Sequence, residues 1–370
     1  MHALCRIPVG LFALMLSMSL IAGCSTLKLP PAVTTVEGAP PHTVTFPLSE
    51  EWSTDVQAGL ATDPFARSGR FVVFGNRQGD VQAVDLDSGR RVGKRGLGHS
   101  IEGSPLWLRD ILVVPIKHGG AGLQALNLST GRKLWRYRFE PVEAGLVNVA
   151  DFVIAAGLRG SVAALEARTG EPVWTIETAG SGFISSPLVL DDSVLLVDRN
   201  GTLFSLDALT GRQLWSTNLE VPIHRSIVVS DGRVFVSSTR GRLFSVDAAE
   251  GMIAWTYDVE DTNARLTQAA VEESSVVVAT SAGIVAGLDA RSGNELWMTN
   301  LNVAVSAKPI VTPASVVIGG LDGYLYLIDR QTGVIQDRQQ MRGRVRAMMA
   351  GGDTGLIIAT EPHHLTRYVW

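Results

Sequence analysis

Short apolar runs recur along the chain at intervals of about 40 residues. Each run holds three or four consecutive aliphatic or aromatic residues without polar alternation, which is typical of a strand buried on both faces. Eight runs are present, and they begin at residues 71, 111, 152, 194, 234, 276, 316 and 356. A period kept over most of a chain predicts a repeat architecture.

A second phrase follows seven of these runs. Residues 203–215 show it in full: an apolar run, a turn of the form Asp-x-x-Thr-Gly, and a further short run that ends on Trp215. The Asp side chain can accept hydrogen bonds from the turn, and Gly tolerates the positive φ that tightens the corner. The phrase therefore predicts a strand, a tight hairpin and a strand. The turn glycines are Gly89, Gly131, Gly170, Gly211, Gly251, Gly293 and Gly333.

The spacing divides each repeat into four strands. A turn such as Arg240-Gly241 separates each apolar run from the hairpin phrase, and a segment with Pro, such as Pro105 or Pro187, precedes several runs. Proline within a strand favours an edge, here the innermost strand beside a central channel. Four strands of ~5–6 residues with tight turns use up about 40 residues and exclude a helix. The sequence predicts an all-β, eight-bladed β-propeller of four-stranded antiparallel blades.

The chain ends predict how the ring closes. The eighth repeat ends at Trp370 after its third strand, whereas residues 46–53, with Trp52, form an isolated strand of the outermost type. We expect this N-terminal strand to complete blade eight, which leaves the ring without an open edge. A large aromatic side chain on each outer strand is expected to pack on the neighbouring blade. The tryptophans assigned to this inter-blade docking are Trp52, Trp135, Trp174, Trp215, Trp255 and Trp297, with Gly93 and Asp337 at the equivalent place in the first and last copies of the phrase.

Composition and charge narrow the class of protein. Hydrophobic residues make up 46% of the chain and charged residues 18%, with 38 glycines, which describes a folded and turn-rich domain. The net charge is −4, and the sequence contains no uninterrupted Lys/Arg-rich run. We therefore expect no binding of nucleic acid, because a basic face would be its signature.

The first residues are those of an export signal. Arg6 precedes an uncharged apolar stretch, residues 11–22, which ends in Leu20-Ile21-Ala22-Gly23-Cys24. This ending resembles the lipobox of bacterial lipoproteins and implies a signal peptide over 1–23 and a lipid on Cys24. An uncleaved membrane anchor is the alternative, although the stretch is shorter than the ~20 residues of a span. Residues 24–43 are expected to be a Pro/Thr-rich tether, and residues 44–370 the propeller.

The tandem Asp-x-x-Thr-Gly-x-x-x-Trp phrases resemble the pyrroloquinoline-quinone-type (PQQ-like) propeller repeat. They differ from WD40 repeats, because none of the repeat tryptophans is followed by Asp. Two groups of proteins share this repeat on eight blades: the quinoprotein alcohol and glucose dehydrogenases, and the BamB family of outer-membrane protein assembly factor lipoproteins. The lipobox, tether, N-terminal Trp strand and eight blades together make the chain similar to the BamB family.

The resemblance implies a scaffold with no enzymatic activity. Such a lipoprotein would face the periplasm from the outer membrane, and Ser25 after the lipidated Cys24 agrees with that membrane. It would act as a monomer within a larger complex and bind the barrel-assembly outer-membrane protein through its periplasmic domains. No cofactor beyond the lipid, no metal and no catalytic residue is expected. A periplasmic propeller that binds a PQQ-type cofactor, and an envelope scaffold with another partner, are the alternatives.

The chain also lacks the marks of the enzymes that share the repeat. Quinoprotein dehydrogenases use a vicinal Cys pair and often a Cys-x-x-Cys-His haem motif, whereas this chain has only Cys5 and Cys24. Its histidines are scattered and show no metal-ligand spacing.

BamB-type proteins bind their partner through loops on one face of blades four to six. The two corresponding loops here span residues 219–225 and 258–267. At the family's acidic pair in the second loop, this chain has Ala264 and Leu266. Solvated connectors without a partner are the alternative for both loops. The resemblance implies six partner-binding residues: Ile223, His224, Arg225, Glu260, Asp261 and Arg265.

Overall fold

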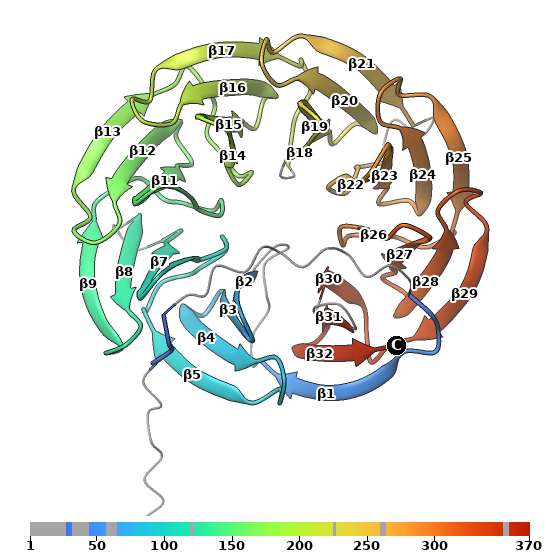
Figure 1. The fold of residues 1–370 in the computed structure, drawn as a ribbon, viewed down its shortest axis with the longest axis horizontal. Coiled ribbons are helices and arrows are strands. Elements are labelled where there is room, and N and C mark those ends of the chain that lie inside the picture. The colour runs from blue at the N-terminus through green and yellow to red at the C-terminus, as the bar shows by residue number, and fades with distance from the viewer. Residues whose placement is uncertain are drawn as a thin grey trace, which may run out of the picture.

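The computed structural model is a ring of eight four-stranded antiparallel sheets (Figure 1). It describes residues 27–31, 44–56, 65–118, 122–224, 227–259, 264–350 and 355–370. All regular elements in these ranges are strands. Seven blades run outward from the channel in chain order, and the eighth takes its outermost strand, β1, from the N-terminal part of the chain. The predicted eight-bladed, all-β propeller is confirmed.

Strands in the same position of successive blades recur at intervals of about 40 residues. The innermost strands are β2 (Phe65–Ser68), β6 (Leu106–Leu108), β10 (Val147–Val149), β14 (Leu188–Leu190), β18 (Val228–Ser230), β22 (Ala270–Glu272), β26 (Ile310–Val311) and β30 (Val345–Ala350). The second strands are β3 (Phe71–Gly75), β7 (Ile111–Pro115), β11 (Phe152–Ala156), β15 (Ser193–Val197), β19 (Arg233–Ser237), β23 (Ser275–Ala279), β27 (Ser315–Gly319) and β31 (Gly355–Thr360).

The outer half of each blade consists of its third strand and its outermost strand. The third strands are β4 (Asp80–Asp85), β8 (Leu123–Asn127), β12 (Ser161–Glu166), β16 (Thr202–Asp207), β20 (Arg242–Asp247), β24 (Ile284–Asp289), β28 (Tyr324–Asp329) and β32 (His364–Val369). The outermost strands are β5 (Arg91–Gly96), β9 (Arg132–Tyr137), β13 (Pro172–Glu177), β17 (Gln213–Asn218), β21 (Ile253–Asp258), β25 (Glu295–Asn300), β29 (Ile335–Gln340) and β1 (Ser49–Asp55).

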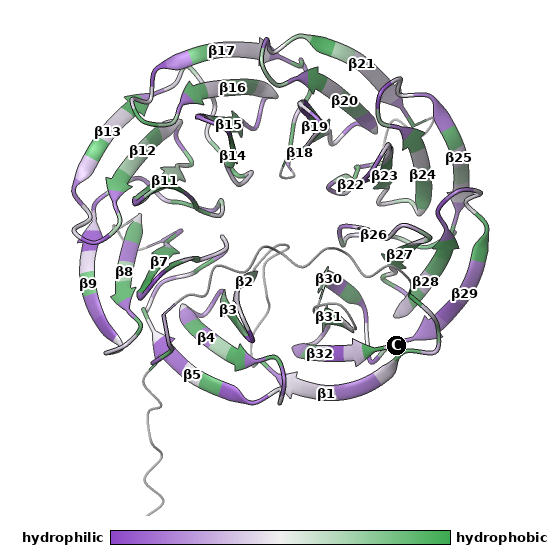
Figure 2. Ribbon diagram, viewed as in Figure 1, coloured by the Kyte–Doolittle hydropathy of each residue, from purple (hydrophilic) through white to green (hydrophobic). Residues whose placement is uncertain are grey.

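The second and third strands form the core of each blade. In blade 4, Val194 pairs with Leu206 and Leu196 with Phe204, and all four side chains are buried. Figure 2 shows the same layering around the ring: β8 and β28 are largely green, whereas β5 and β9 carry purple segments. The apolar runs without alternation are buried because each blade packs against a neighbour on both faces.

The Asp-x-x-Thr-Gly phrase folds as a hydrogen-bonded corner. The Asp207 carboxylate accepts hydrogen bonds from the Thr210 backbone N–H at 2.8 Å and from the Thr210 hydroxyl at 2.7 Å. Gly211 takes a φ of +73° and donates its N–H to the Asp207 carbonyl. A bulge follows between Ser205 and Leu206, and it brings Trp215 opposite Ser205. The corner and the bulge together direct the tryptophan toward the next blade.

Each tryptophan of the repeat contacts the corner of the following blade. The Trp215 indole N–H donates to the Ala248 carbonyl at 3.2 Å. A Cβ placed on Gly251 would lie 2.5 Å from the Trp215 ring, so only glycine fits beneath it. The same indole-to-carbonyl bond joins Trp52 to Leu86, Trp135 to Ala167, Trp174 to Ala208, Trp255 to Ala290 and Trp297 to Arg330.

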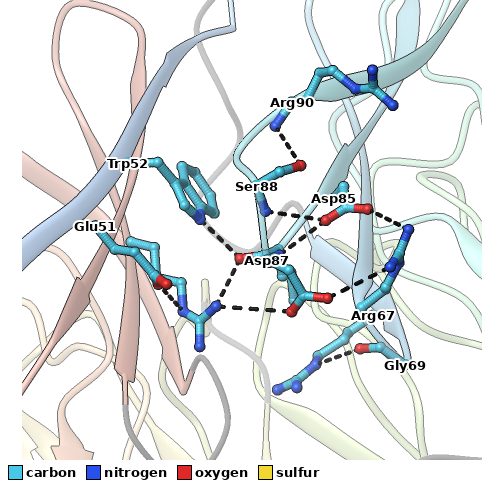
Figure 3. Close-up of polar contacts among 11 residues, drawn as sticks. Glu51, Trp52, Arg67, Gly69, Asp85, Asp87, Ser88 and Arg90 are labelled. Carbon is cyan, nitrogen blue, oxygen red and sulfur yellow. Dashed lines mark hydrogen bonds and ion pairs between the residues drawn. The ribbon is translucent and has the colours of Figure 1, made fainter.

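The ring closes as expected, through an N-terminal strand. β1 pairs antiparallel with β32 and becomes the outer strand of blade 8, although it spans Ser49–Asp55 and begins three residues later than Phe46. Figure 3 shows this closure, where Trp52 faces the corner that holds Asp85 and Ser88. The indole N–H reaches the Leu86 carbonyl at 2.8 Å, and Asp85 accepts from the Ser88 N–H at 3.1 Å.

At two blade interfaces the preceding outer strand carries no repeat tryptophan, and the N-terminal segment packs at both. Between blades 1 and 2, Leu27 and Leu29 are buried, with 1% and 5% of their surfaces exposed. Between blades 7 and 8, Val44 and Leu48 pack into the core, and the Leu48 backbone exchanges two hydrogen bonds with the Gln339 amide. Residues 27–31 are therefore docked on the propeller, a correction to the expectation that they belong to a free tether.

Candidate partner interface

The meander of each blade creates two different rims. In blade 4, the turns at Asp191-Asp192 and Thr210-Gly211 lie at one end of the strands, which we call the turn rim. The turn at 199–201 and residues 219–224, the described part of the connection to blade 5, lie at the other end, the loop rim. Both loops predicted to bind a partner belong to the loop rim.

The two predicted loops contact the same hairpin turn of blade 5, residues 238–241. The Thr239 N–H donates to the Pro222 carbonyl of the first loop at 3.0 Å, and Ile223 forms a β-bridge with Ser238. From the other side, the Leu266 N–H of the second loop donates to the Ser238 carbonyl at 3.2 Å. Two segments about 40 residues apart in sequence thus form one continuous surface around this turn.

The apolar members of the two loops hold them in place. Ile223 has no exposed surface and packs with Leu219 and Val221 in the core between blades 4 and 5. Ala264 and Leu266 are also buried. Ile223 therefore contributes its side chain to the core and leaves the exposed surface to its neighbours.

The exposed described residues of the two loops carry both signs of charge: Glu220 and Asp258 are anionic, and Arg265 is cationic. His224 and Arg265 are exposed, and the Arg265 backbone is fixed by hydrogen bonds to Ser281 at 3.0 Å and 2.8 Å. Three further predicted residues lie outside the described residues: Arg225, Glu260 and Asp261.

The structure adds Arg240 to this surface. It is exposed at the tip of the 238–241 turn, between the two loops, and its N–H donates to the Ser238 hydroxyl at 3.2 Å. Beside it, Arg242 forms a bidentate ion pair with Asp258 at 2.6 Å and 3.0 Å, and this hydrogen bonding raises the pKa of Arg242. The sequence shows Arg240 only as a turn residue, because nothing local reveals which loops flank the turn.

A hollow of about 600 Å³ lies on the opposite, turn rim between blades 4 and 5. Asp191, Asp207, Asp231 and Asp247 line it. The Asp207 and Asp247 carboxylates already accept hydrogen bonds from their own corners, so this acidic character follows from turn formation. Within the described ranges, no group of three or more His, Cys, Asp and Glu residues is arranged to hold a metal, and no helix could cross a membrane.

The comparisons with known proteins point to one family. The family model described as outer membrane protein assembly factor BamB matches residues 49–143, 119–223 and 158–366. The BamB of Shewanella oneidensis is 25% identical over 311 residues, which cover 80% of this chain and 66%, just under two thirds, of that protein.

Solved structures share the fold. The crystal structure of BamB from Moraxella catarrhalis superimposes with a TM-score of 0.73 at 19% identity, over 87% of this chain and 100% of that one. A quinohemoprotein alcohol dehydrogenase from Pseudomonas putida gives a TM-score of 0.73 at 11% identity, over 87% of this chain and 76% of the enzyme. At these identities the structural likeness establishes the propeller fold alone.

Proposed function

The chain belongs to the family of the outer membrane protein assembly factor BamB, and we propose that it is a lipid-anchored scaffold for the assembly of outer-membrane β-barrel proteins. It acts from the periplasmic face of the outer membrane, without catalysis, as a monomer within a larger complex. Its partner is the barrel-assembly outer-membrane protein, bound through periplasmic domains. The observation that carries this proposal is the common surface of the two loops around the 238–241 turn.

Physical features of that surface support binding of a protein. The 238–241 turn and the described parts of both loops are hydrogen-bonded to one another and rest on a packed core, so this part of the surface is formed before a partner arrives. A preorganised surface loses little conformational entropy on binding. Its exposed cations, among them Arg240 and Arg265, match a partner segment that carries carboxylates, because arginine pairs with carboxylates in a bidentate geometry.

Affinity purification from detergent-solubilised envelopes tests the partner. We expect the tagged protein to recover the barrel-assembly protein, and Arg240→Glu or Arg225→Glu to lower that recovery by at least about tenfold, since each reversal replaces an attraction with a repulsion. Arg291→Glu, an exposed arginine on the turn rim, is the matched control and should have no effect. Recovery of other envelope proteins alone would contradict the proposed partner.

Mass spectrometry of the N-terminal peptide tests the anchor. We expect the mature chain to begin at Cys24 and to carry acyl chains, and Cys24→Ser to release the protein from the membrane in high salt. An N-terminus upstream of Cys24 would contradict this part of the proposal.

A further inference from the structure

Residues 27–31 take the place of a missing tryptophan. The Trp position of β5 is Gly93, and a Cβ there would lie 2.9 Å from the Leu27 Cα atom. The carbonyl that accepts an indole N–H at the tryptophan interfaces is that of Leu128 here, and it accepts from the Leu29 backbone N–H at 2.9 Å. The segment therefore reproduces both the packing and the hydrogen bond of the absent side chain, and in Figure 1 it is the dark blue trace beside β5.

The docked segment lies at the most basic part of the circumference. β5 and β9, the outer strands of blades 1 and 2, each carry three cations and no carboxylate. The other six outer strands together carry one cation, Arg338, and seven carboxylates. We call the cationic side chains of these two strands the basic edge: Arg91, Lys94, Arg95, Arg132, Lys133 and Arg136.

Most of the basic edge is available to a partner. Arg91, Arg132, Lys133 and Arg136 are exposed, as is Lys28 of the docked segment. Among the described residues, the only ion pair made by the basic edge is that of Lys94 with Asp80, at 2.9 Å. Because β5 and β9 are 40 residues apart in sequence, this concentration of charge arises only when blades 1 and 2 pack together.

Docking also shortens the distance between the anchor and the ring. Cys24 lies three residues before Leu27, and three peptide units extend to about 11 Å. If the propeller began at residue 44, the 20 intervening residues would behave as a flexible chain with a mean extension of about 25 Å. The docked segment thus connects the lipid to one defined place on the circumference.

We propose that the basic edge rests on the membrane and binds the phosphates of anionic phospholipid headgroups. This inference uses the lipid on Cys24 from the proposed function for its geometry, whereas its charge complementarity is independent of that lipid. In this orientation the outer strands of blades 1 and 2 face the membrane. The loop rim of blades 4–6, on the other side of the ring, remains free for a protein partner (Figure 1).

Vesicle binding without the anchor tests the charge. The chain from residue 24 onward, with Cys24→Ser, should bind phosphatidylcholine vesicles that contain phosphatidylglycerol and should not bind phosphatidylcholine alone. Because each basic residue near an anionic surface strengthens binding about fivefold, the triple variant Arg132→Glu, Lys133→Glu, Arg136→Glu should weaken binding by roughly 100-fold. The matched control, Arg212→Glu, Arg291→Glu, Arg338→Glu, reverses three exposed arginines of blades 4, 6 and 7 and should leave it within about twofold.

Equal effects of the two triple variants would overturn the proposal. So would a basic edge that shows no affinity for anionic vesicles but is needed to recover an acidic protein from envelopes.

The orientation is measured on the lipidated protein. Leu134→Cys on β9 and Leu296→Cys on β25 place one label each before Trp135 and Trp297, on opposite sides of the ring (Figure 1). A quencher attached to headgroups should quench the label at 134 several-fold more than the label at 296. Gly93→Trp should fill the interface from within β5, displace the docked segment and reduce this difference, and Leu27→Asp should do the same if the tryptophan variant misfolds.

The two proposals fail in different ways. A chain that leaves the vesicles in high salt lacks the lipid, which contradicts the anchor, while the unanchored chain still reports on the basic edge. Equal quenching at 134 and 296 in a chain that stays on the vesicles would contradict the orientation alone.

Discussion

Six blade interfaces are filled by a tryptophan of the preceding blade, whereas the other two are filled by the N-terminal segment. A tryptophan such as Trp215 reaches the next corner from within its own repeat. Leu29 reaches the equivalent carbonyl, that of Leu128, from a segment about 100 residues away in sequence. The same recess can thus be filled locally or from a distance, and at blades 1 and 2 the distant solution fixes residues 27–31 on the ring.

The two kinds of interface differ in the free energy that each buried side chain contributes. A tryptophan buries ~150–250 Å², which at ~25 cal/mol per Å² gives an upper bound of about 4–6 kcal/mol. A fully buried leucine contributes about 1.5–3 kcal/mol on the same scale. Leu27 and Leu29 together thus come close to one tryptophan. We nevertheless expect their interface to open first, because a short terminal segment can detach locally while the ring stays folded.

The largest effect is expected at a tryptophan interface. Trp297 is 7% exposed and donates its indole N–H to the Arg330 carbonyl at 2.6 Å. Trp297→Ala should lower the free energy of unfolding by about 3–5 kcal/mol, measured by urea denaturation, because a large cavity and an unpaired carbonyl remain. Trp297→Phe should retain part of the packing and lose less. A loss below about 1 kcal/mol for the alanine variant would show that the tryptophans are not what joins the blades.

The glycine beneath the tryptophan gives a test with a matched control. Gly333 has a φ of +71°, and a Cβ there would lie 2.6 Å from the Trp297 ring. Gly232 has a φ of +68°, with no atom within 4 Å of its Cβ position. Gly232→Ala should lower the free energy of unfolding by about 1 kcal/mol through backbone strain alone. Gly333→Ala should lower it by about 2–4 kcal/mol, since overpacking is added. Equal losses would show that the ring adapts without cost.

The N-terminal segment should be the next weaker element. Leu27→Ala should lower the free energy of unfolding by about 2 kcal/mol at most, because the segment can detach and leave the ring folded. Hydrogen exchange measures this directly: the Leu29 N–H should exchange faster in the variant, while the backbone N–H of Leu206 inside blade 4 should not change. Unchanged protection at Leu29 would contradict the docking of residues 27–31.

The two kinds of interface also differ in whether the sequence alone predicts them. The repeat predicted the blades and the closing strand, because the corner at Asp207 and the apolar run at 194–197 are local patterns. It did not predict the docking of residues 27–31, since two leucines on either side of Lys28 are too short a pattern to assign. The recess that receives Leu27 exists because Gly93, 66 positions later, has no side chain.

The candidate site was predictable to a similar extent. The family resemblance indicated the two loops, but it could not show that Ile223 is buried or that Arg240 lies between them. Burial and proximity depend on how blades 4, 5 and 6 pack. The basic edge was missed for the same reason, because its cations come from two repeats and form no run in the sequence.

The smallest predicted effect is on stability at low pH. It distinguishes corners built on Asp, such as that of Asp289, from the corner of blade 2, which is built on Asn127. Hydrogen bonds from the Ser292 hydroxyl and backbone N–H, both at 2.7 Å, lower the pKa of Asp289. A carboxyl whose pKa is lower in the folded state contributes stability above its unfolded value of about 3.9, and this is lost as pH falls through the folded pKa. Asp289→Asn should therefore make urea stability less sensitive to pH below about 4, by less than about 1 kcal/mol because the group is only partly buried.

An aspartate introduced at the corner of blade 2 should contribute to stability with a pH dependence opposite to that of Asp289. Asn127 accepts the same two hydrogen bonds from Thr130 through an amide oxygen that does not titrate, and its amide N–H donates to Asp110 at 2.8 Å. Asn127→Asp would place two carboxylates in contact and raise the pKa of one of them. A raised folded pKa stabilises below the unfolded value and is lost as pH rises, so this variant should lose stability toward neutral pH. If Asn127→Asp instead gained stability relative to the unchanged protein as pH rose, contact with Asp110 would not be what sets the pKa of the new carboxyl.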